Sequence, residues 1–165
     1  MANPPDVEIR PLTPADQPFL WECLYFAIYV PVGTPPPGLE ILDRPDLSKY
    51  VADWGRPTDS GFLAFNPSTG VNLGAIWLRQ FTANNAAYGF VAENIPELGM
   101  AVVPDFRGKG LGTKLMERVL AAKKHPAISL SVSPKNPALK LYERFDFKKV
   151  GEKGDSWTML WKEKS

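Results

Sequence analysis

The sequence predicts one mixed α/β (α+β) domain over residues 1–165, with a central mixed sheet that carries helices on both faces. Three observations favour this class. The chain has 165 residues, which is the length of one ordinary domain. Some segments alternate between apolar and polar residues or are continuously apolar, as strands are. Others repeat apolar residues at three- and four-residue steps, as helices do. Along the chain these segments interleave as a strand, two helices, a run of strands, a helix, a strand, a helix and two strands.

Eight segments have the alternation or the apolar composition of strands. They are residues 6–12, 61–66, 71–81, 88–91, 97–103, 127–132, 147–150 and 156–161. The turn at residues 66–70 predicts that the second and third of these segments form a hairpin. A Gly-Asp turn at residues 154–155 predicts a closing hairpin between the last two.

Four segments are predicted to be helical. Thr13 and Pro14 look like an N-cap and a first helical turn, and an apolar stripe follows through residues 19–28. A second helix is predicted over about residues 45–54. The third begins directly after a glycine-rich loop, and the fourth opens at Asn136. The proline-rich stretch 31–38 between the first two helices cannot be helical, and it is either a stiff surface loop or a substrate lid.

Composition excludes several classes of function. The chain has one cysteine, Cys23, and one histidine, His125. It therefore offers neither a disulfide framework nor a multi-cysteine or two-histidine metal site, and no metal is expected. No segment is apolar over the roughly 18 residues that a membrane helix needs, and no secretory leader is visible. The net charge of +1 argues against nucleic-acid and membrane-surface binding. We therefore expect a soluble, cytoplasmic protein.

The charge is unevenly distributed along the chain. Residues 1–100 carry 5 basic and 11 acidic residues, whereas residues 101–165 carry 14 basic and 7 acidic residues. The basic part matches an anionic ligand and the acidic part a cationic one, although solvated helix faces and loops would give the same counts.

The glycine-rich loop Arg107-Gly108-Lys109-Gly110-Leu111-Gly112 lies between a predicted strand and a predicted helix. Glycines allow several backbone N–H groups to converge on an anion, and the helix N-terminus adds the positive end of its dipole. The loop is therefore a candidate phosphate or pyrophosphate site. It matches neither the Walker A spacing nor the dinucleotide fingerprint, because the required lysine and third glycine are missing.

These residues resemble the GNAT superfamily of acyl-CoA-dependent N-acyltransferases. The loop matches the family signature Arg/Gln-x-x-Gly-x-Gly/Ala, and Asn136 through Tyr142 match its downstream Asn…Ala…Tyr pattern with a variant spacing. Asp146 stands where glycine is usual. The resemblance covers about residues 95–151 and implies a mostly antiparallel sheet of about six or seven strands flanked by about four helices.

The resemblance also implies a function, which is acetyl-CoA-dependent transfer of an acetyl group to a primary amine. The pantetheine arm of coenzyme A would pair with Met100, Ala101 and Val102, and its pyrophosphate would lie on the N–H groups of residues 107–112. Asn136 would contact the cofactor, and Tyr142 would lie near the thioester sulfur. The acceptor would be a small-molecule or peptide amine, and a homodimer is one option because small enzymes of this family are often dimers.

Acyl transfer needs a neutral amine, whereas an alkylamine with a pKa near 10.4 is almost fully protonated at pH 7. Glu97 is the candidate base, directly or through a water, unless it is merely an exposed glutamate at a strand edge; Glu93 is a weaker substitute. Tyr142 is the candidate acid for the leaving thiolate, unless it is a core tyrosine. Ser131 stands where other members carry a glutamate. Cys23 is expected to be a packing residue and His125 a surface residue.

Aromatic residues of the N-terminal part either line an acceptor pocket or belong to the core. Tyr29, Trp77 and Tyr88 are the candidates for contact with the acceptor. The other members of the set are Tyr25, Trp54, Phe81 and Phe90. Two alternatives to an enzyme remain open at this stage, a non-catalytic acyl-CoA sensor of the same fold and a protein-interaction module that uses the proline-rich loop.

Overall fold

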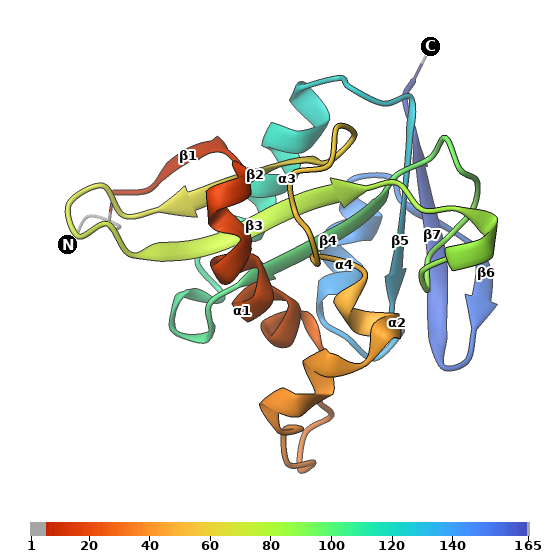
Figure 1. The fold of residues 1–165 in the computed structure, drawn as a ribbon, viewed down its shortest axis with the longest axis horizontal. Coiled ribbons are helices and arrows are strands. Elements are labelled where there is room, and N and C mark those ends of the chain that lie inside the picture. Colours follow the sequence, from red (N-terminus) through yellow and green to blue (C-terminus); the bar gives the residue numbers. More distant parts are fainter. Residues whose placement is uncertain (1–5, 165) are drawn as a thin grey trace.

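The computed structural model describes residues 6–164 as a seven-stranded sheet between two layers of helices (Figure 1). The strands are β1 (Glu8–Pro11), β2 (Ser60–Phe65), β3 (Asn72–Arg79), β4 (Glu97–Val102), β5 (Ala127–Val132), β6 (Lys148–Lys153) and β7 (Ser156–Lys162). Their order across the sheet is β1-β2-β3-β4-β5-β7-β6. Only the β4–β5 pair is parallel in this described sheet, so the predicted mixed, mostly antiparallel architecture is confirmed.

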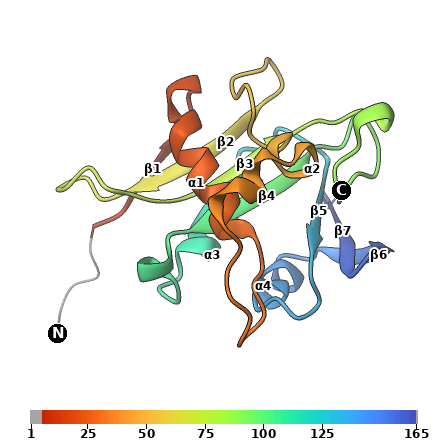
Figure 2. The ribbon, with the colours of Figure 1, turned by 60° about the horizontal axis from the view of Figure 1, so that its bottom comes forward.

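Helices cover both faces of the sheet, as expected. Figure 2 shows α1 and α2 on one face and α3 and α4 on the other. The α-helices are α1 (Gln17–Ala27), α2 (Pro45–Ser48), α3 (Leu111–Ala121) and α4 (Ala138–Arg144). Short 3-10 helices occur at Pro14–Asp16, Leu39–Asp43, Ala83–Asn85 and Pro104–Phe106.

Alternation along the strands produces a separate apolar core on each face. In β3, Ala75 and Trp77 face α1, whereas Ile76 and Leu78 face α3. The core under α1 also contains Leu20, Cys23, Tyr50, Val51, Trp54, Leu63 and Phe81. The core under α3 also contains Leu111, Leu115, Met116, Leu98, Ile128, Leu130, Tyr142 and Phe147. Successive residues of β4 and β5 therefore point alternately to the α1 face and to the α3 face.

Residues 88–91 were expected to form a strand, and that prediction is wrong. They form a turn in which the backbone N–H groups of Tyr88 and Gly89 bind the side chains of Tyr50 and Glu97. Gly89 lies directly on β5, since a Cβ atom there would come within 2.6 Å of the carbonyl carbon of Leu130. The turn therefore crosses the face of the sheet instead of joining it.

The helix predicted over residues 45–54 is shorter than expected, because α2 ends at Ser48. Beyond it, the carbonyl oxygens of Lys49 and Ala52 accept hydrogen bonds from the buried guanidinium of Arg79, at 2.9 and 2.6 Å. Asp53 has a left-handed backbone with φ 56°, which stops any continuation of the helix. The N–H groups of residues 49–52 still donate to carbonyls three or four residues earlier, but Arg79 takes the carbonyl oxygens that would continue the helix.

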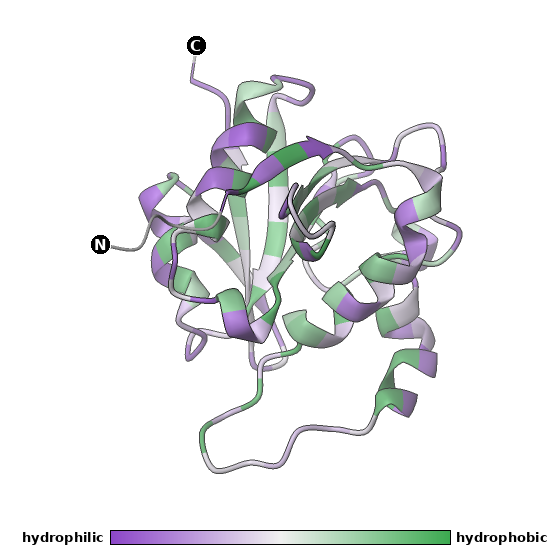
Figure 3. Ribbon diagram, turned by 90° about the vertical axis from the view of Figure 1, so that its left-hand side faces the viewer, coloured by the Kyte–Doolittle hydropathy of each residue, from purple (hydrophilic) through white to green (hydrophobic). Residues whose placement is uncertain are grey.

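The proline-rich segment between α1 and the 3-10 helix at residues 39–43 is an extended loop, as the sequence predicts. Figure 3 shows it projecting away from the body of the protein. The Tyr25 hydroxyl of α1 donates a 2.6 Å hydrogen bond to the carbonyl oxygen of Pro37, which ties the far end of the loop to the helix.

Candidate active site

The sheet opens between β4 and β5. These strands pair at the start, where Glu97 lies beside Ser129 and the Ser129 N–H donates to the carbonyl of Pro96 at 3.0 Å. No later pair joins them in the described chain, and Figure 1 shows β5 running steeply across the direction of β4. Backbone groups at the far ends of both strands are therefore left for another partner, apart from the Val102 carbonyl, which accepts the Arg107 side chain.

The backbone of β4 supplies such groups on alternate residues. Val103 donates its N–H to the carbonyl of Leu73 next to β3, at 2.9 Å. Because alternate residues of a strand point their backbone groups in opposite directions, Ala101 also faces β3, whereas Met100 and Val102 face the opening. Of the three residues predicted to pair with pantetheine, Met100 and Val102 have the matching orientation. Ala101 does not, because its backbone groups are directed to β3.

The glycine loop follows β4 and has the conformation that the sequence suggests. Gly108 and Gly110 have φ of 76° and 82°, a left-handed backbone that other residues adopt with strain. The Arg107 N–H, which was expected to bind the pyrophosphate, donates instead to the Pro104 carbonyl at 3.3 Å, whereas within residues 6–164 no backbone N–H from Gly108 to Gly112 donates to a backbone carbonyl. These free donors stand at the N-terminus of α3, where the helix dipole favours negative charge. The loop therefore fits a phosphate or pyrophosphate group.

Two contacts fix the loop against the sheet. The Arg107 guanidinium donates to the carbonyl oxygens of Val102 and Phe26, at 3.2 and 3.1 Å, and so joins the end of β4 to the end of α1. Gly112 allows α3 to approach α4 closely, because a Cβ atom there would lie 3.1 Å from Leu141. Leu111 is buried in the core, whereas Lys109 is exposed, with its ammonium 4.8 Å from the ring centre of Phe106.

Glu97 is buried, with 3% of its surface exposed, which overturns the alternative of an exposed glutamate at a strand edge. Its Oε1 accepts the Gly89 N–H at 2.9 Å, and its Oε2 accepts a short hydrogen bond from the Tyr50 hydroxyl. Burial raises the pKa of Glu97 to about 7, and the hydrogen bonds from Tyr50 and Gly89 oppose that rise. A carboxyl group with a pKa near neutral is suited to exchange protons at physiological pH.

Tyr50 is the residue of this site that sequence reasoning missed. It follows α2 and lies 47 positions before Glu97, in a segment with no recognisable motif. Burial, and then the charge of Glu97, raises the pKa of Tyr50 well above its usual value, so the hydroxyl stays protonated and donates. The same oxygen accepts the Tyr88 N–H at 3.0 Å. No pattern in the sequence signals this pairing.

Two buried polar atoms on the same face of the sheet have no hydrogen-bond partner within residues 6–164. They are Ser129 Oγ, in the residue beside Glu97, and Trp77 Nε1, whose indole ring lies on Gly99 of β4. Buried polar atoms of this kind are usually satisfied by ordered water or a ligand. Trp77 itself is 1% exposed, which favours its assignment to the core over direct contact with an acceptor.

Tyr142 lies on the opposite face of the sheet from Glu97, in the core under α3. Its ring packs edge-on against Phe147 with 6.0 Å between ring centres. Burial raises the pKa of Tyr142 to about 12, so its hydroxyl is a proton donor at neutral pH. Unlike Ser129 Oγ and Trp77 Nε1, the Tyr142 hydroxyl oxygen is not a buried polar atom that lacks a hydrogen-bond partner. Tyr142 and Glu97 thus flank β4 from opposite sides.

A pocket of about 600 Å³ lies at the open end of β5, between the end of α1 and the β6–β7 turn. It contains two of the predicted site residues, Tyr29 and Asn136. The Asn136 side chain also accepts the N–H of Ala138, the first residue of α4, at 2.9 Å. Charged residues in the lining are Lys135 and Asp155, and hydroxyl groups come from serines of β5 and β7, including Ser131.

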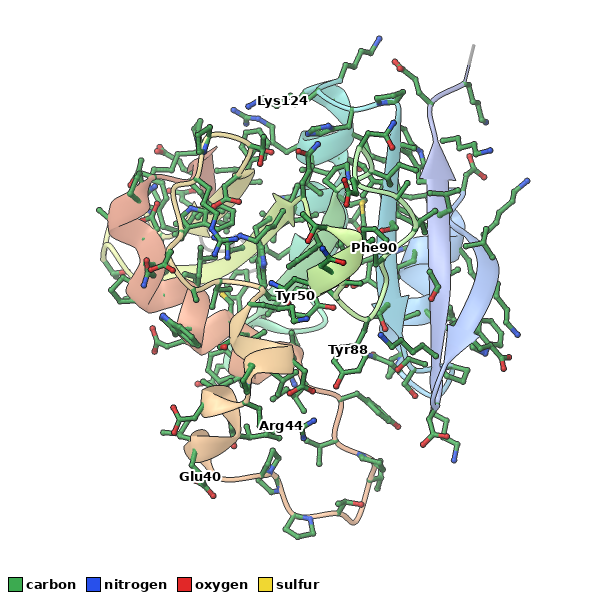
Figure 4. The ribbon with its side chains drawn as sticks, turned by 45° about the vertical axis from the view of Figure 1, so that its right-hand side comes forward. Glu40, Arg44, Tyr50, Tyr88, Phe90 and Lys124 are labelled. Carbon is green, nitrogen blue, oxygen red and sulfur yellow. The ribbon has the colours of Figure 1, made fainter. Side chains whose placement is uncertain are left out.

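Tyr88, the third candidate for acceptor contact, is half-buried beside this region. Figure 4 shows it below Tyr50, between the α2 segment and the β6–β7 strands. Its hydroxyl donates a short hydrogen bond to Asp46, which raises the pKa of Tyr88. The Lys153 ammonium lies 5.6 Å from its ring centre.

The remaining candidates lie outside this arrangement. Cys23 is buried in the core under α1, where burial raises the pKa of its thiol, as expected for a packing residue. The Glu93 carboxylate accepts the Ala83 N–H at 2.9 Å on the surface. His125 follows α3 at the other end of the sheet, where burial lowers its pKa. Among residues 6–164, no three His, Cys, Asp or Glu side chains gather as metal ligands would.

Comparison with known proteins identifies the family. The model of the GNAT acetyltransferase domain matches residues 60–149, which is more than half of the chain and includes β4, the glycine loop and α4. The chain therefore belongs to the GNAT acetyltransferase family. A curated relative, the 5-NmdU N-acetyltransferase of Pseudomonas phage PaMx11, is 29% identical over 131 residues, which cover 75% of this chain and 90% of the relative.

Solved structures confirm the fold. An N-acetyltransferase from Staphylococcus aureus Mu50 has a TM-score of 0.65 at 18% identity, covering 95% of this chain and 98% of its own. A mutant spermidine N-acetyltransferase from Vibrio cholerae has a TM-score of 0.60 at 18% identity, covering 94% and 93%. The family match and the curated relative make the chain an N-acetyltransferase, which transfers acetyl to an amine. Within residues 6–164, no helix has the length and apolar character that a bilayer crossing requires.

Proposed function

We propose that the protein transfers an acetyl group directly from acetyl-CoA to the primary amine of a small molecule. The observation that carries the proposal is the continuity of the free β4 edge with the free N–H groups of the glycine loop. One linear ligand with an amide-bearing arm and a pyrophosphate satisfies both. Acetyl-CoA has this form, and when bound it supplies an activated acyl thioester.

The residues proposed to hold acetyl-CoA lie along β4, the glycine loop and the end of β5. The backbone groups of Met100 and the N–H of Val102 would pair with the arm, and N–H groups from Gly108 to Gly112 would bind the pyrophosphate. Arg107 and Lys109 add positive charge beside the loop, although Arg107 also holds the loop to β4 and α1. Asn136 would contact the cofactor from the pocket at the end of β5.

Glu97 is proposed as the base. Both carboxylate oxygens already accept one hydrogen bond, and the residue is 3% exposed, so an incoming amine cannot displace these contacts without rearrangement. A carboxylate has about four acceptor positions in all, which leaves room for one water. The amine proton would pass through that water to Glu97. The unpartnered Ser129 hydroxyl beside Glu97 supports a water at this position.

Tyr142 is proposed as the acid. As the new C–N bond forms and the C–S bond breaks, the departing sulfur gains negative charge and takes a proton. The Tyr142 hydroxyl, with a pKa of about 12, is protonated at neutral pH and can donate that proton. We propose no covalent acyl-enzyme, because the single cysteine, Cys23, is buried in the core and cannot act as the nucleophile.

The acceptor is proposed to carry one amine and little further positive charge. A polyamine requires several carboxylates along its length, whereas the lining of the 600 Å³ pocket offers Asp155 and opposes it with Lys135. Of the acceptors named for the relatives, 5-NmdU therefore suits this chain better than spermidine.

A thiol-release assay tests the proposal. Purified protein is mixed with acetyl-CoA and, separately, with 5-NmdU, benzylamine or spermidine, and free coenzyme A is measured together with the acetylated product. We expect release that depends on both substrates, with 5-NmdU or benzylamine faster than spermidine. Faster acetylation of spermidine would refute the acceptor class. No release with any amine, together with no acetyl-CoA binding, would refute the function.

A further inference from the structure

A second pocket lies on the α3 face, at the opposite end of the sheet from the glycine loop. It measures about 170 Å³ and is bounded by the end of α3 and by β2, β3, β5 and β7. Its walls are largely apolar and include Phe62, Leu78, Val119, Ile128 and Trp161. Since α3 has 11 residues, the two ends of the helix are about 16 Å apart. The pocket shares no residue with the proposed acetyl-CoA site.

One buried polar atom in the lining has no partner. Ser60 begins β2 and, by the alternation of that strand, faces α3 together with Phe62. Its hydroxyl oxygen is sealed from solvent and makes no hydrogen bond within the described chain. A buried hydroxyl without a partner costs about 1–3 kcal/mol, and a ligand that opens this wall of the pocket and supplies a polar group would remove that cost.

The rim of the pocket is basic. Lys123 and Lys124 follow α3 and line the entrance, and no carboxylate is part of the lining. Figure 4 shows Lys124 at the end of α3, far from Tyr50 and Tyr88. A helix C-terminus by itself repels anions, but two of its final carbonyls accept the N–H groups of Ala122 and Lys123. The Arg118 guanidinium, 5.1 Å from the ring centre of Phe62, adds a third positive charge nearby.

Size and charge define the ligand. An apolar cavity of about 150 Å³ in a protein core accommodates one benzene ring, so this pocket has the volume for a single six-membered ring. The lysines complement a negative charge at the mouth. We propose that this pocket binds a monocyclic aromatic carboxylate, with the ring between α3 and the sheet and the carboxylate at Lys123 and Lys124. A ring hydroxyl would pair with the unpartnered oxygen of Ser60 once the ligand displaces the side chains that seal it.

Titration of the ¹⁵N-labelled full chain with benzoate, followed by backbone amide NMR shifts, tests this site. We expect saturable shifts around residues 60–62 and 123–125, and binding of benzyl alcohol at least about tenfold weaker because it lacks the charge. Shifts that do not saturate, that centre on the glycine loop, or that are equal for benzyl alcohol would overturn the proposal.

Exposed lysines provide matched variants that keep the fold. Lys124→Glu is expected to weaken benzoate binding about tenfold, whereas Lys148→Glu on β6 leaves it unchanged. Ser60→Ala should abolish any gain in affinity of a hydroxybenzoate over benzoate. Equal effects of the two lysine variants would contradict the assigned site. A parallel acetyl-CoA titration separates this outcome from a failure of the proposed enzymatic function, since the two sites share no residue.

Discussion

The Tyr50 hydroxyl donates a hydrogen bond to Oε2 of Glu97, and this contact joins the segment after α2 to the first residue of β4. Because the bond stabilises the ionised carboxylate, it lowers the pKa of Glu97 against the effect of burial. With Glu97 as the proposed base, burial and the Tyr50 hydrogen bond together set the pH at which the base becomes active.

Removing the Tyr50 hydroxyl should shift the pH profile of catalysis. In the wild type, kcat/KM is expected to rise with pH through about 7, where Glu97 ionises. In Tyr50→Phe the carboxylate loses a donor, so the pKa of Glu97 rises and the ascending limb moves to higher pH. Tyr25→Phe removes a hydroxyl that binds Pro37 outside the site and should leave the limb in place. Glu97→Gln should abolish the limb and reduce kcat/KM by about 100-fold or more. An unchanged limb in Tyr50→Phe would contradict this account.

The pKa of Glu97 also predicts how folding stability depends on pH. The folded protein holds the Glu97 proton up to a pKa of about 7, whereas the unfolded chain releases it near 4.5. The folded state therefore binds more protons between these values, and the free energy of unfolding falls as pH rises from 4.5 to 7, by about 3 kcal/mol at most. Urea denaturation at pH 5 and pH 8 measures the difference. The change in the free energy of unfolding between the two pH values should be smaller in Glu97→Gln than in the wild type. An equal change in both proteins would be evidence that Glu97 titrates normally.

Tyr142→Phe tests the proposed acid. The ring packs against Phe147 and stays in the core, so folding and acetyl-CoA affinity should be retained. We expect kcat to fall by about 100-fold, because a protonated hydroxyl no longer faces the departing sulfur. Calorimetric titration with acetyl-CoA and the thiol-release assay measure the two quantities separately. Full activity in Tyr142→Phe would leave Tyr142 as a core tyrosine only.

The buried ion pair between Arg79 and Asp59 predicts a large effect on stability. Both side chains are almost fully buried, two hydrogen bonds of 3.0 and 2.8 Å join them, and Arg79 lies on the Trp54 ring. Asp59→Asn leaves the guanidinium charge without its counter-ion and should destabilise the protein by about 3–5 kcal/mol. Glu152→Gln, which breaks an exposed pair with Lys149, should cost no more than about 1 kcal/mol. Urea unfolding of both variants gives the comparison, and similar losses would contradict it.

The sequence predicts the elements whose patterns are local. The glycine loop, the α3 stripe and the alternation of β2, β3 and β7 are each legible within about ten residues, and the structure confirms these elements. Asn136 is also recognisable, since it is a motif residue just before α4 and its side chain accepts the N–H of the first helical residue. The family resemblance rests on the same local segments.

The features that the sequence predicted wrongly or missed depend on contacts between residues far apart in the chain. Residues 88–91 have the composition of a strand, but Glu97 and Tyr50 capture their N–H groups. The helix after Pro45 stops early because Arg79, some 30 residues away, takes its carbonyl oxygens. Tyr50 acquires its role only by folding over Glu97. No local pattern encodes these partners, so sequence reasoning placed Glu97 at the right strand without its environment.

Binding of acetyl-CoA at the glycine loop tests the central claim most directly. Gly110 and Gly70 both have left-handed backbones, with φ of 82° and 75°, and both have open space where a side chain would begin. Glutamate at either position therefore imposes similar strain, but only Gly110→Glu places a negative charge in the proposed pyrophosphate site. Calorimetric titration should show micromolar binding of acetyl-CoA to the wild type and to Gly70→Glu, and at least a 100-fold loss in Gly110→Glu. Equal affinity in the two variants, or no binding to the wild type, would contradict the assignment of this loop and the reaction built on it.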